Sequence, residues 1–247
     1  MKGSCFMGFV AELLKAGEGE NPLCVICGRR KEENTIADDG VSVCTACYHK
    51  LMEAKVSDYY ETENLLNRLF APFTYEGKLR ESIFKLKFNG CPKFAGALGK
   101  LILDALPPYY LYDFDMIVPV PLSRERQEER GYNQAKLLAE PIAKGLDIPL
   151  KDDVLFRIRD TKRQMNLSRS LRDLNVRGAF FAPEGEVKGK KILLIDDIYT
   201  AGSTANESTR EMLSKGAESV TCLVLCSNFY KESKNEYRVS IPTVFKK

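Results

Sequence analysis

Short apolar runs and amphipathic segments alternate along most of this chain. Largely apolar runs flanked by polar or turn residues predict strands at 116–120, 192–195 and 219–226. Apolar positions that recur every three or four residues predict helices at 79–86, 94–105, 131–145 and 204–215. Repeated strand–loop–helix units imply a parallel sheet with right-handed crossovers. We therefore expect an α/β fold that binds its ligand where the strands end.

The first 56 residues do not follow this pattern. Phe6, Phe9, Val10, Leu13 and Leu14 lie at helical spacing and predict a short amphipathic helix. The polar segment 28–43 has too few large apolar residues to build a core alone. We expect a small N-terminal domain over residues 1–56 and a larger domain over residues 57–247.

Charge and cysteine content narrow the classes of function. The net charge of the 247 residues is +3, so bulk charge alone does not predict nucleic-acid binding. No apolar stretch approaches the roughly 18 residues of a membrane span, and we expect neither a span nor a signal peptide. Of the eight cysteines, four form two Cys-x-x-Cys pairs and four are scattered. This distribution favours a reducing, cytoplasmic setting.

The two Cys-x-x-Cys pairs have the spacing of a structural zinc site. Cys24 and Cys27 form one pair and Cys44 and Cys47 the other. Four thiolates fill a tetrahedral zinc site completely, so the predicted role of the metal is structural. A thioredoxin-like redox pair or two disulfides are the alternatives. His49, the only histidine, is either a substitute ligand or a surface residue.

An acidic pair and a hydroxyl-rich loop follow the apolar run at 192–195. Asp196 and Asp197 come first, and Thr200, Ala201, Gly202, Ser203 and Thr204 form the loop. Thr204 and Glu207 have capping-box spacing, so we expect a helix to begin at this point. The unpaired N–H groups of a helix start bind anions. A sugar phosphate would place its phosphate in the loop and its hydroxyls at the aspartates. The alternative is a plain buried strand that enters a capped helix.

A second turn lies at the same predicted sheet edge. Pro121, Leu122, Ser123 and Arg124 follow the strand at 116–120, and arginines in the next turn could pair with pyrophosphate. The positive charge of these arginines is offset by Glu125, Glu128 and Glu129, so a salt-bridged helix start remains the alternative.

Basic residues concentrate between positions 157 and 177, a segment that contains seven Lys or Arg and only two Asp. Such a segment beside a phosphate site can act as a lid that excludes water. It can also follow the phosphates of a nucleic acid, or it can be an ordinary solvated surface. The candidate contact residues are Arg159, Arg163, Gln164, Arg169 and Arg172.

The stretch 192–207 resembles the phosphoribosyl-pyrophosphate (PRPP) motif of type I phosphoribosyltransferases. The whole chain resembles the ComF family of competence proteins. The residues that carry the second resemblance are the four-cysteine ribbon, Leu86-Lys87-Phe88, the segment 119–122, the segment 130–134, Thr161, Gln164, Leu167, Arg172, Asn175-Val176, Ala179-Phe180 and the segment 194–198.

These resemblances imply a type I phosphoribosyltransferase-like core behind a zinc ribbon. In such a site Asp196 and Asp197 hold the ribose with Mg²⁺, the loop 200–204 holds the 5′-phosphate, and residues 121–124 contact pyrophosphate. The ComF resemblance implies a role in DNA uptake during natural transformation, with helicase-like and DNA-processing partners. We expect either a phosphoribosyltransferase, or a non-catalytic module that binds a nucleotide or single-stranded DNA and recruits partners through the ribbon.

Overall fold

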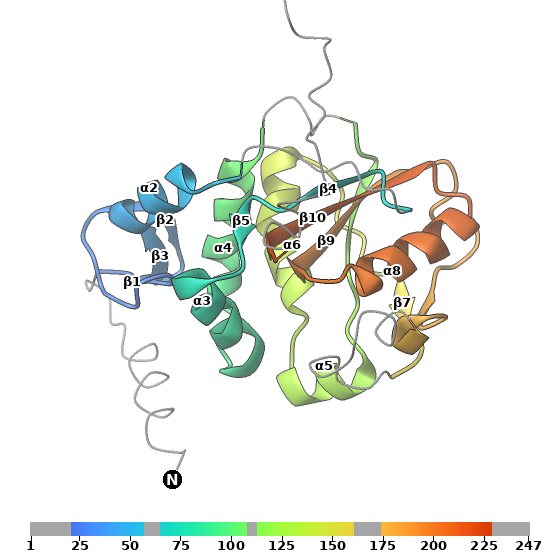
Figure 1. Cartoon of the computed structure of the whole chain (residues 1–247), viewed down its shortest axis with the longest axis horizontal. Helices are drawn as coiled ribbons and strands as arrows, with labels where there is room; N and C mark the ends of the chain where they lie inside the picture. Colours follow the sequence, from blue (N-terminus) through green and yellow to red (C-terminus); the bar gives the residue numbers. More distant parts are fainter. Residues whose placement is uncertain (1–20, 57–64, 108–112, 161–173, 229–247) are drawn as a thin grey trace, which may run out of the picture.

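The computed structural model describes residues 21–56, 65–107, 113–160 and 174–228 (Figure 1). The amphipathic helix predicted near the N-terminus lies outside these residues. Within the described ranges, no helix has both the length and the apolar character needed to cross a membrane.

A parallel sheet forms the centre of the larger part, as the sequence predicts. Its strand order is β4-β10-β9-β6, and β5 also pairs with β10. All of these pairings are parallel. The strands are β4 (Arg68–Phe70), β5 (Phe73–Thr74), β6 (Met116–Pro119), β9 (Lys191–Tyr199) and β10 (Ser219–Ser227).

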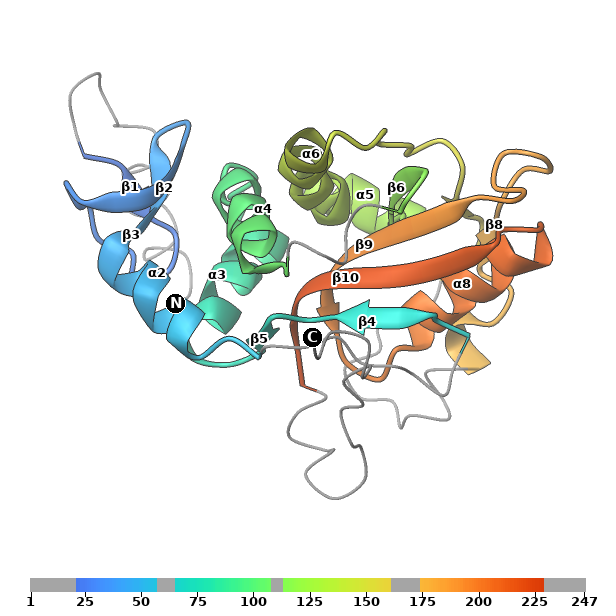
Figure 2. The same cartoon turned by 90° about the horizontal axis from the view of Figure 1, so that it is seen from above.

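Both faces of the sheet are buried, which explains why its strands are apolar without alternation. Leu193 and Ile195 of β9 pack into one buried cluster with α4 and α6. Ile192 and Leu194 pack into a second cluster on the other face, which includes Met212 of α8. Figure 2 shows α4 and α6 on one side of the sheet and α8 on the other. The helices are α3 (Gly77–Phe88), α4 (Phe94–Ala105), α5 (Arg124–Arg130), α6 (Gln134–Leu146) and α8 (Ser203–Ser214).

The helix predicted at 131–145 begins later than expected. A separate short helix, α5, precedes it and ends at Gly131, whose φ of 80° is left-handed. The side chain of Asn133 then caps α6 by accepting from the amide of Ala135. A two-stranded antiparallel hairpin of β7 (Phe156–Arg157) and β8 (Phe180–Phe181) flanks the basic segment.

The N-terminal unit is a small ribbon that packs on α4. It comprises β1 (Leu23–Cys24), β2 (Asn34–Asp38), β3 (Val41–Cys44) and α2 (Thr45–Glu53). Val25 and Val43 of this unit belong to the same buried cluster as α3, α4 and one face of the sheet. At Gly96 of α4 a Cβ atom would lie 1.6 Å from the carboxylate of Asp38, so a larger residue here would force that side chain to move. The division of the chain at residue 56 stays a prediction.

Candidate functional site

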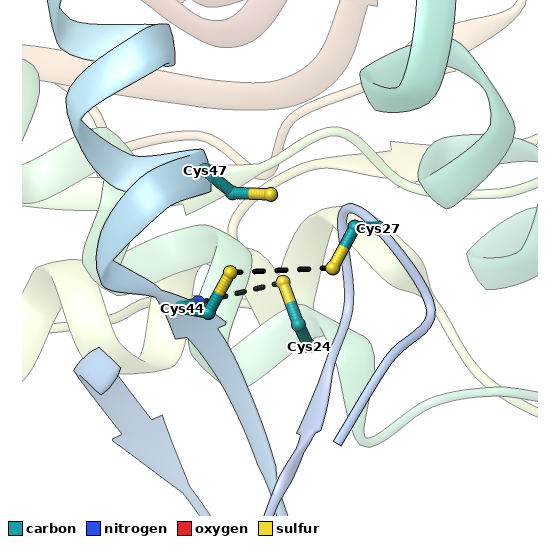
Figure 3. Close-up of side chains that lie close together, drawn as sticks. All are labelled: Cys24, Cys27, Cys44 and Cys47. Carbon is teal, nitrogen blue, oxygen red and sulfur yellow. Dashed lines mark hydrogen bonds between the residues drawn. The ribbon is translucent and has the colours of Figure 1, made fainter. Parts of the chain in front are cut away.

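The four predicted cysteines converge in the ribbon. Their sulfur atoms all lie within 4.8 Å of one another (Figure 3). The edge of a ZnS₄ tetrahedron is about 3.8 Å for Zn–S bonds near 2.3 Å, so small shifts would seat one ion. Cys27 Sγ and Cys44 Sγ are 4.0 Å apart, and all four side chains are free thiols. The cluster fits a structural zinc ion, and the disulfide alternative is not what the structure shows.

Local structure presents these sulfurs. Cys24 ends β1 and Cys44 ends β3, while Cys47 lies in the first turn of α2. Burial raises the pKa of Cys24, but amide N–H groups from Cys27, Cys44 and Ile26 outweigh it and the pKa is lowered. Burial and the neighbouring sulfurs raise the pKa of Cys44 and Cys47, so a bound cation is needed to hold all four as thiolates. An anionic sulfur is the form that binds a metal. His49 is exposed and packs edge-on against Tyr48, so it is a surface residue.

The acidic pair lies within a strand rather than after it. β9 continues through Asp196 and Asp197 to Tyr199, and it stays paired with β10 over this length. The prediction that the strand ends at the aspartates is therefore wrong. Because the strand continues, successive side chains point to opposite faces, and the two carboxylates have different surroundings.

Asp197 is buried and already has a cationic partner. It is 2% exposed, and its Oδ1 lies 2.8 Å from Nζ of Lys87 at the end of α3. Its Oδ2 has no hydrogen-bond partner among the described residues. The sequence analysis assigned Lys87 no role of its own. The only signal was its place in the Leu86-Lys87-Phe88 motif, because an ion pair across 110 positions leaves no local pattern.

Asp196 is partly exposed at the edge of a small cavity. Its Oδ1 accepts a hydrogen bond of 2.8 Å from the amide of Asp197. Burial, followed by the negative charge of Asp197, raises the pKa of Asp196 to about 7. The fold therefore opposes negative charge at this position, as expected where a cation or a hydroxylated ligand is needed to complete the site.

The predicted loop and the start of α8 form the wall of this cavity, which has a volume of about 40 Å³. That is several times the space one water requires. Ser203 is buried, and its Oγ has no hydrogen-bond partner in the described part of the chain. The lining residues are Asp196, Ile198, Tyr199, Thr200, Gly202, Ser203, Thr204, Ala205 and Val224. A buried hydroxyl beside unpaired helix-start N–H groups can serve an anion.

The cap of α8 differs from the prediction. Gly202, not Thr204, precedes the helix, and its φ of +79° is one that glycine adopts without strain. A Cβ at Gly202 would lie 2.2 Å from Oη of Tyr199. Glu207 forms no capping box, because its Oε1 accepts from the amide of Gly178 at 2.7 Å. The prediction was wrong because the Glu207 carboxylate, which local spacing assigned to the helix cap, instead binds an amide 29 positions earlier in the chain.

The segment 121–124 begins beside the acidic pair but lies along a different hollow. The amide of Val120 donates to the carbonyl of Ile195, one residue before Asp196. Pro121, Leu122 and Arg124 line a hollow of about 620 Å³ that shares no lining residue with the cavity at α8.

The start of α5 is built as a capped and salt-bridged turn. Ser123 caps α5 by accepting from the amide of Arg126. Arg124 extends into solvent and pairs with Glu128 at 2.8 Å. The salt-bridged helix start is what the structure shows for this side chain.

Only the ends of the basic segment are described. Arg159 donates to the carbonyl of Asn175 at 3.2 Å and to that of Arg177, so its guanidinium ties the two ends together. Glu207 of α8 holds Gly178 at the far end. The predicted contact residues Arg163, Gln164, Arg169 and Arg172 lie outside the described residues.

Comparison with known proteins shows the family to which the chain belongs. The phosphoribosyl transferase domain matches residues 133–245. The DNA utilization protein YhgH of Escherichia coli is 35% identical over 163 residues, which cover 64% of this chain and 71% of that protein. The chain belongs to the ComF/YhgH family. The competence protein ComFC of Bacillus subtilis is 29% identical over 204 residues, covering 82% of this chain and 77% of its own length.

The other comparisons are less extensive. Competence protein F of Haemophilus influenzae is 36% identical over 121 residues, or 48% of this ComF-family chain and 53% of that protein. Among solved structures, the allosteric regulatory enzyme of purine biosynthesis covers 55% of this chain and 26% of its own, at 23% identity and a TM-score of 0.36. A hypoxanthine phosphoribosyltransferase of Staphylococcus aureus covers 63% and 76%, at 16% identity and a TM-score of 0.30.

Proposed function

We propose that the end of β9 and the start of α8 bind a phosphoribosyl compound of the PRPP type. The 5′-phosphate occupies the loop of Thr200, Ala201, Gly202, Ser203 and Thr204, and the ribose hydroxyls face Asp196 and Asp197. The single observation that carries this proposal is the buried Ser203 hydroxyl, which lines the cavity beside Asp196 and has no partner among the described residues. The phosphoribosyl transferase domain match supports it, since residues 133–245 include the whole of this site.

The donor set also suits a magnesium ion that arrives with the ligand. Mg²⁺ prefers one or two protein carboxylates together with water and substrate phosphates. Burial and the charge of Asp197 raise the pKa of Asp196, and Asp197 keeps one oxygen unpaired in the described part of the chain, so a divalent cation would stabilise both carboxylates. The bound ion would neutralise charge between the ribose and the pyrophosphate.

The proposed reaction is phosphoribosyl transfer. The bond between C1 of the ribose and the pyrophosphate oxygen breaks, the pyrophosphate leaves with the bonding electron pair, and an acceptor nucleophile bonds to C1. Asp196 and Asp197 position the ribose, and the turn at Pro121–Arg124 contacts the leaving group. This turn is adjacent to the acidic pair through the bond from Val120 to Ile195. Fixed polar groups at the departing charge lower the barrier.

A second candidate function is binding without turnover. The observation in its favour is the ion pair between Lys87 and Asp197, because a carboxylate that is already neutralised attracts Mg²⁺ less strongly. In this version the pocket recognises a nucleotide, or the end of a single DNA strand, and the ribbon recruits partner proteins.

The cellular role we infer follows the family. Relatives are named competence proteins and DNA utilization proteins, so we propose that this chain acts in DNA uptake in the cytoplasm, together with DNA-processing partners. The ribbon would hold a structural Zn²⁺, since four thiolates leave no open position for substrate.

Isothermal titration with PRPP and Mg²⁺ tests the proposed ligand. We expect saturable binding by the unchanged protein and at least a tenfold loss of affinity in Asp196→Asn/Asp197→Asn. Asp113→Asn is the matched control, because Asp113 pairs with Lys191 at the opposite end of β9. Equal affinity in all three proteins, or no binding by any, would rule out the site. Release of pyrophosphate with candidate acceptor bases then separates turnover from binding.

A further inference from the structure

The exposed face of α3 carries an aromatic stripe that the phosphoribosyl site does not use. We define this stripe as Phe84 and Phe88 with Arg80 and Arg130 at its two ends. Arg80, Phe84 and Phe88 are four residues apart, which places them on one side of the helix. Phe84 is 53% and Phe88 is 48% exposed. Their ring centres are 5.0 Å apart, so the two rings form one continuous surface.

Cations lie at both ends of this surface. The guanidinium of Arg130 is 5.5 Å from the ring centre of Phe88. At the other end, the guanidinium of Arg80 is 5.6 Å from the ring centre of Tyr75. These positions are within the range of cation–π contacts, which hold the guanidinium groups in place beside the rings.

The helix itself has a positive surplus. α3 contains four basic residues and one acidic residue. The acidic residue, Glu81, pairs with Lys78 at 2.8 Å, and Lys87 points inward to Asp197.

Arg130 is half-buried, donates to Gln134 and lies near the charge of Asp197, whereas Arg80 is exposed. An apolar protein partner would desolvate Arg80 without neutralising it, which is costly. A ligand that combines flat rings with negative charges avoids that cost.

We propose that the aromatic stripe binds single-stranded DNA. Unpaired bases stack on Phe84 and Phe88, and the flanking phosphates contact Arg80 and Arg130. Stacking platforms of this kind tolerate any base sequence, because every base has a flat face. The choice of DNA over RNA rests on the proposed role in DNA uptake; the stacking chemistry rests on the stripe alone.

The position of the stripe links it to the phosphoribosyl site. Phe88 directly follows Lys87, whose ammonium group is bound to Asp197. The hydroxyl of Tyr132 donates to the carbonyl of Leu86, which fixes the end of α3 against the segment between α5 and α6. The stripe and the lysine that pairs with Asp197 therefore share the last turn of α3.

Fluorescence anisotropy with the full zinc-loaded chain tests this proposal. The probe is a labelled twelve-nucleotide oligodeoxythymidine, and an abasic strand of equal length carries the same phosphates without bases. Phe84→Leu/Phe88→Leu keeps the apolar area but removes the rings. We expect it to weaken oligodeoxythymidine binding by about 10- to 100-fold, from the energy of stacking one or two bases, and to leave abasic binding unchanged.

Matched variants make the result specific to rings and charges. Phe84→Tyr/Phe88→Tyr keeps both rings and should retain binding. Phe181→Leu removes an exposed ring on β8 and should have little effect. Arg80→Gln should lower the slope of log affinity against log salt by about 0.7, the value for one phosphate contact of a single strand.

Several results would overturn the proposal. The first is equal affinity of the Phe84→Leu/Phe88→Leu and Phe84→Tyr/Phe88→Tyr proteins for oligodeoxythymidine. The second is that Phe84→Leu/Phe88→Leu weakens binding of the abasic strand as much, or that Phe181→Leu weakens oligodeoxythymidine binding as much. The third is tighter binding of oligouridine than of oligodeoxythymidine. PRPP titration of the Phe84→Leu/Phe88→Leu protein should match the unchanged protein. A failure of DNA binding is thereby distinguished from a failure of the phosphoribosyl site.

Discussion

The ribbon and the acidic pair each bring like charges together: four cysteine sulfurs, which repel one another as thiolates, and two carboxylates. The two sites differ in what neutralises these charges. Four thiols converge in the ribbon, and among the described residues no His, Asp or Glu joins them. At the acidic pair the fold supplies its own cation, Lys87, which reaches Asp197 from α3. The ribbon therefore depends on an external ion, whereas the acidic pair is partly neutralised before any ligand binds.

α3 connects these two regions. The hydroxyl of Ser82 donates to the carbonyl of Val25 between the first two cysteines, at 2.6 Å. One and a half turns later Lys87 meets Asp197. The contrast between the regions can be tested by removing each source of positive charge in turn.

Removing the ribbon's metal should have the largest effect. Cys24→Ser should abolish stoichiometric zinc and destabilise the ribbon, because structural zinc contributes on the order of 10 kcal/mol to small ribbons. Val25 and Val43 share a buried cluster with α3 and α4, so faster hydrogen exchange should extend to residues 77–105. Native mass spectrometry and hydrogen exchange measure both effects.

Cys91→Ser is the control for that experiment. Cys91 is buried in the same cluster but lies outside the four-cysteine site. If both variants kept one zinc per chain, the four-cysteine assignment would be wrong.

Removing the cation of the acidic pair should have a smaller effect. Lys87→Met leaves the buried Asp197 carboxylate unpaired and should lower the free energy of unfolding by about 3 kcal/mol. Adding Asp197→Asn to this variant should recover most of the lost free energy of unfolding. Lys191→Met, which breaks a surface pair with Asp113, should cost less than about 1 kcal/mol. Urea unfolding measures all three, and equal losses in the two lysine variants would contradict a buried, coupled pair.

The pH dependence of stability should show the smallest effect. Asp196 has a pKa of about 7 in the folded chain and about 3.9 when unfolded. Between these values the folded chain binds more protons, so the free energy of unfolding falls as pH rises from about 4 to 7. The full shift would correspond to about 4 kcal/mol, but Asp196 is partly exposed, so solvent screening should keep the loss below that of Lys87→Met.

Asp196→Asn removes this dependence. Its melting temperature should exceed that of the unchanged protein at pH 8 and approach it at pH 5. Thermal unfolding followed by circular dichroism across this range gives the comparison. Parallel curves for the two proteins would show that Asp196 is not held in its protonated form by the fold.

The sequence predicted the parts of this molecule that local patterns determine. The strand from Ile192 and the four cysteines were found because a buried strand and a zinc ribbon have short signatures. The apolar spacing of α3 and α4 was equally informative. The mistakes concern long-range contacts. Nothing near Glu207 signals its bond to Gly178, and nothing near Lys87 signals Asp197.

The extent of β9 could not be predicted for the same reason. Two aspartates are poor strand residues, and local propensity ends the strand before them. Pairing with β10 carries it on to Tyr199, because Val224 opposes Asp196 and Cys226 opposes Ile198. The tertiary environment overrides propensity at the position where the chain needs charge.

The central claim is that the loop before α8 holds the 5′-phosphate of PRPP. Phosphorus NMR tests it directly, because the 5′-phosphate and the pyrophosphate of PRPP give separate signals. With Mg²⁺ and excess protein, we expect the 5′-phosphate signal to shift or broaden. We expect this change to disappear in Gly202→Ala, where a new Cβ meets the ring of Tyr199. A 5′-phosphate signal that stays at its free position, or one that moves equally in both proteins, would contradict the account.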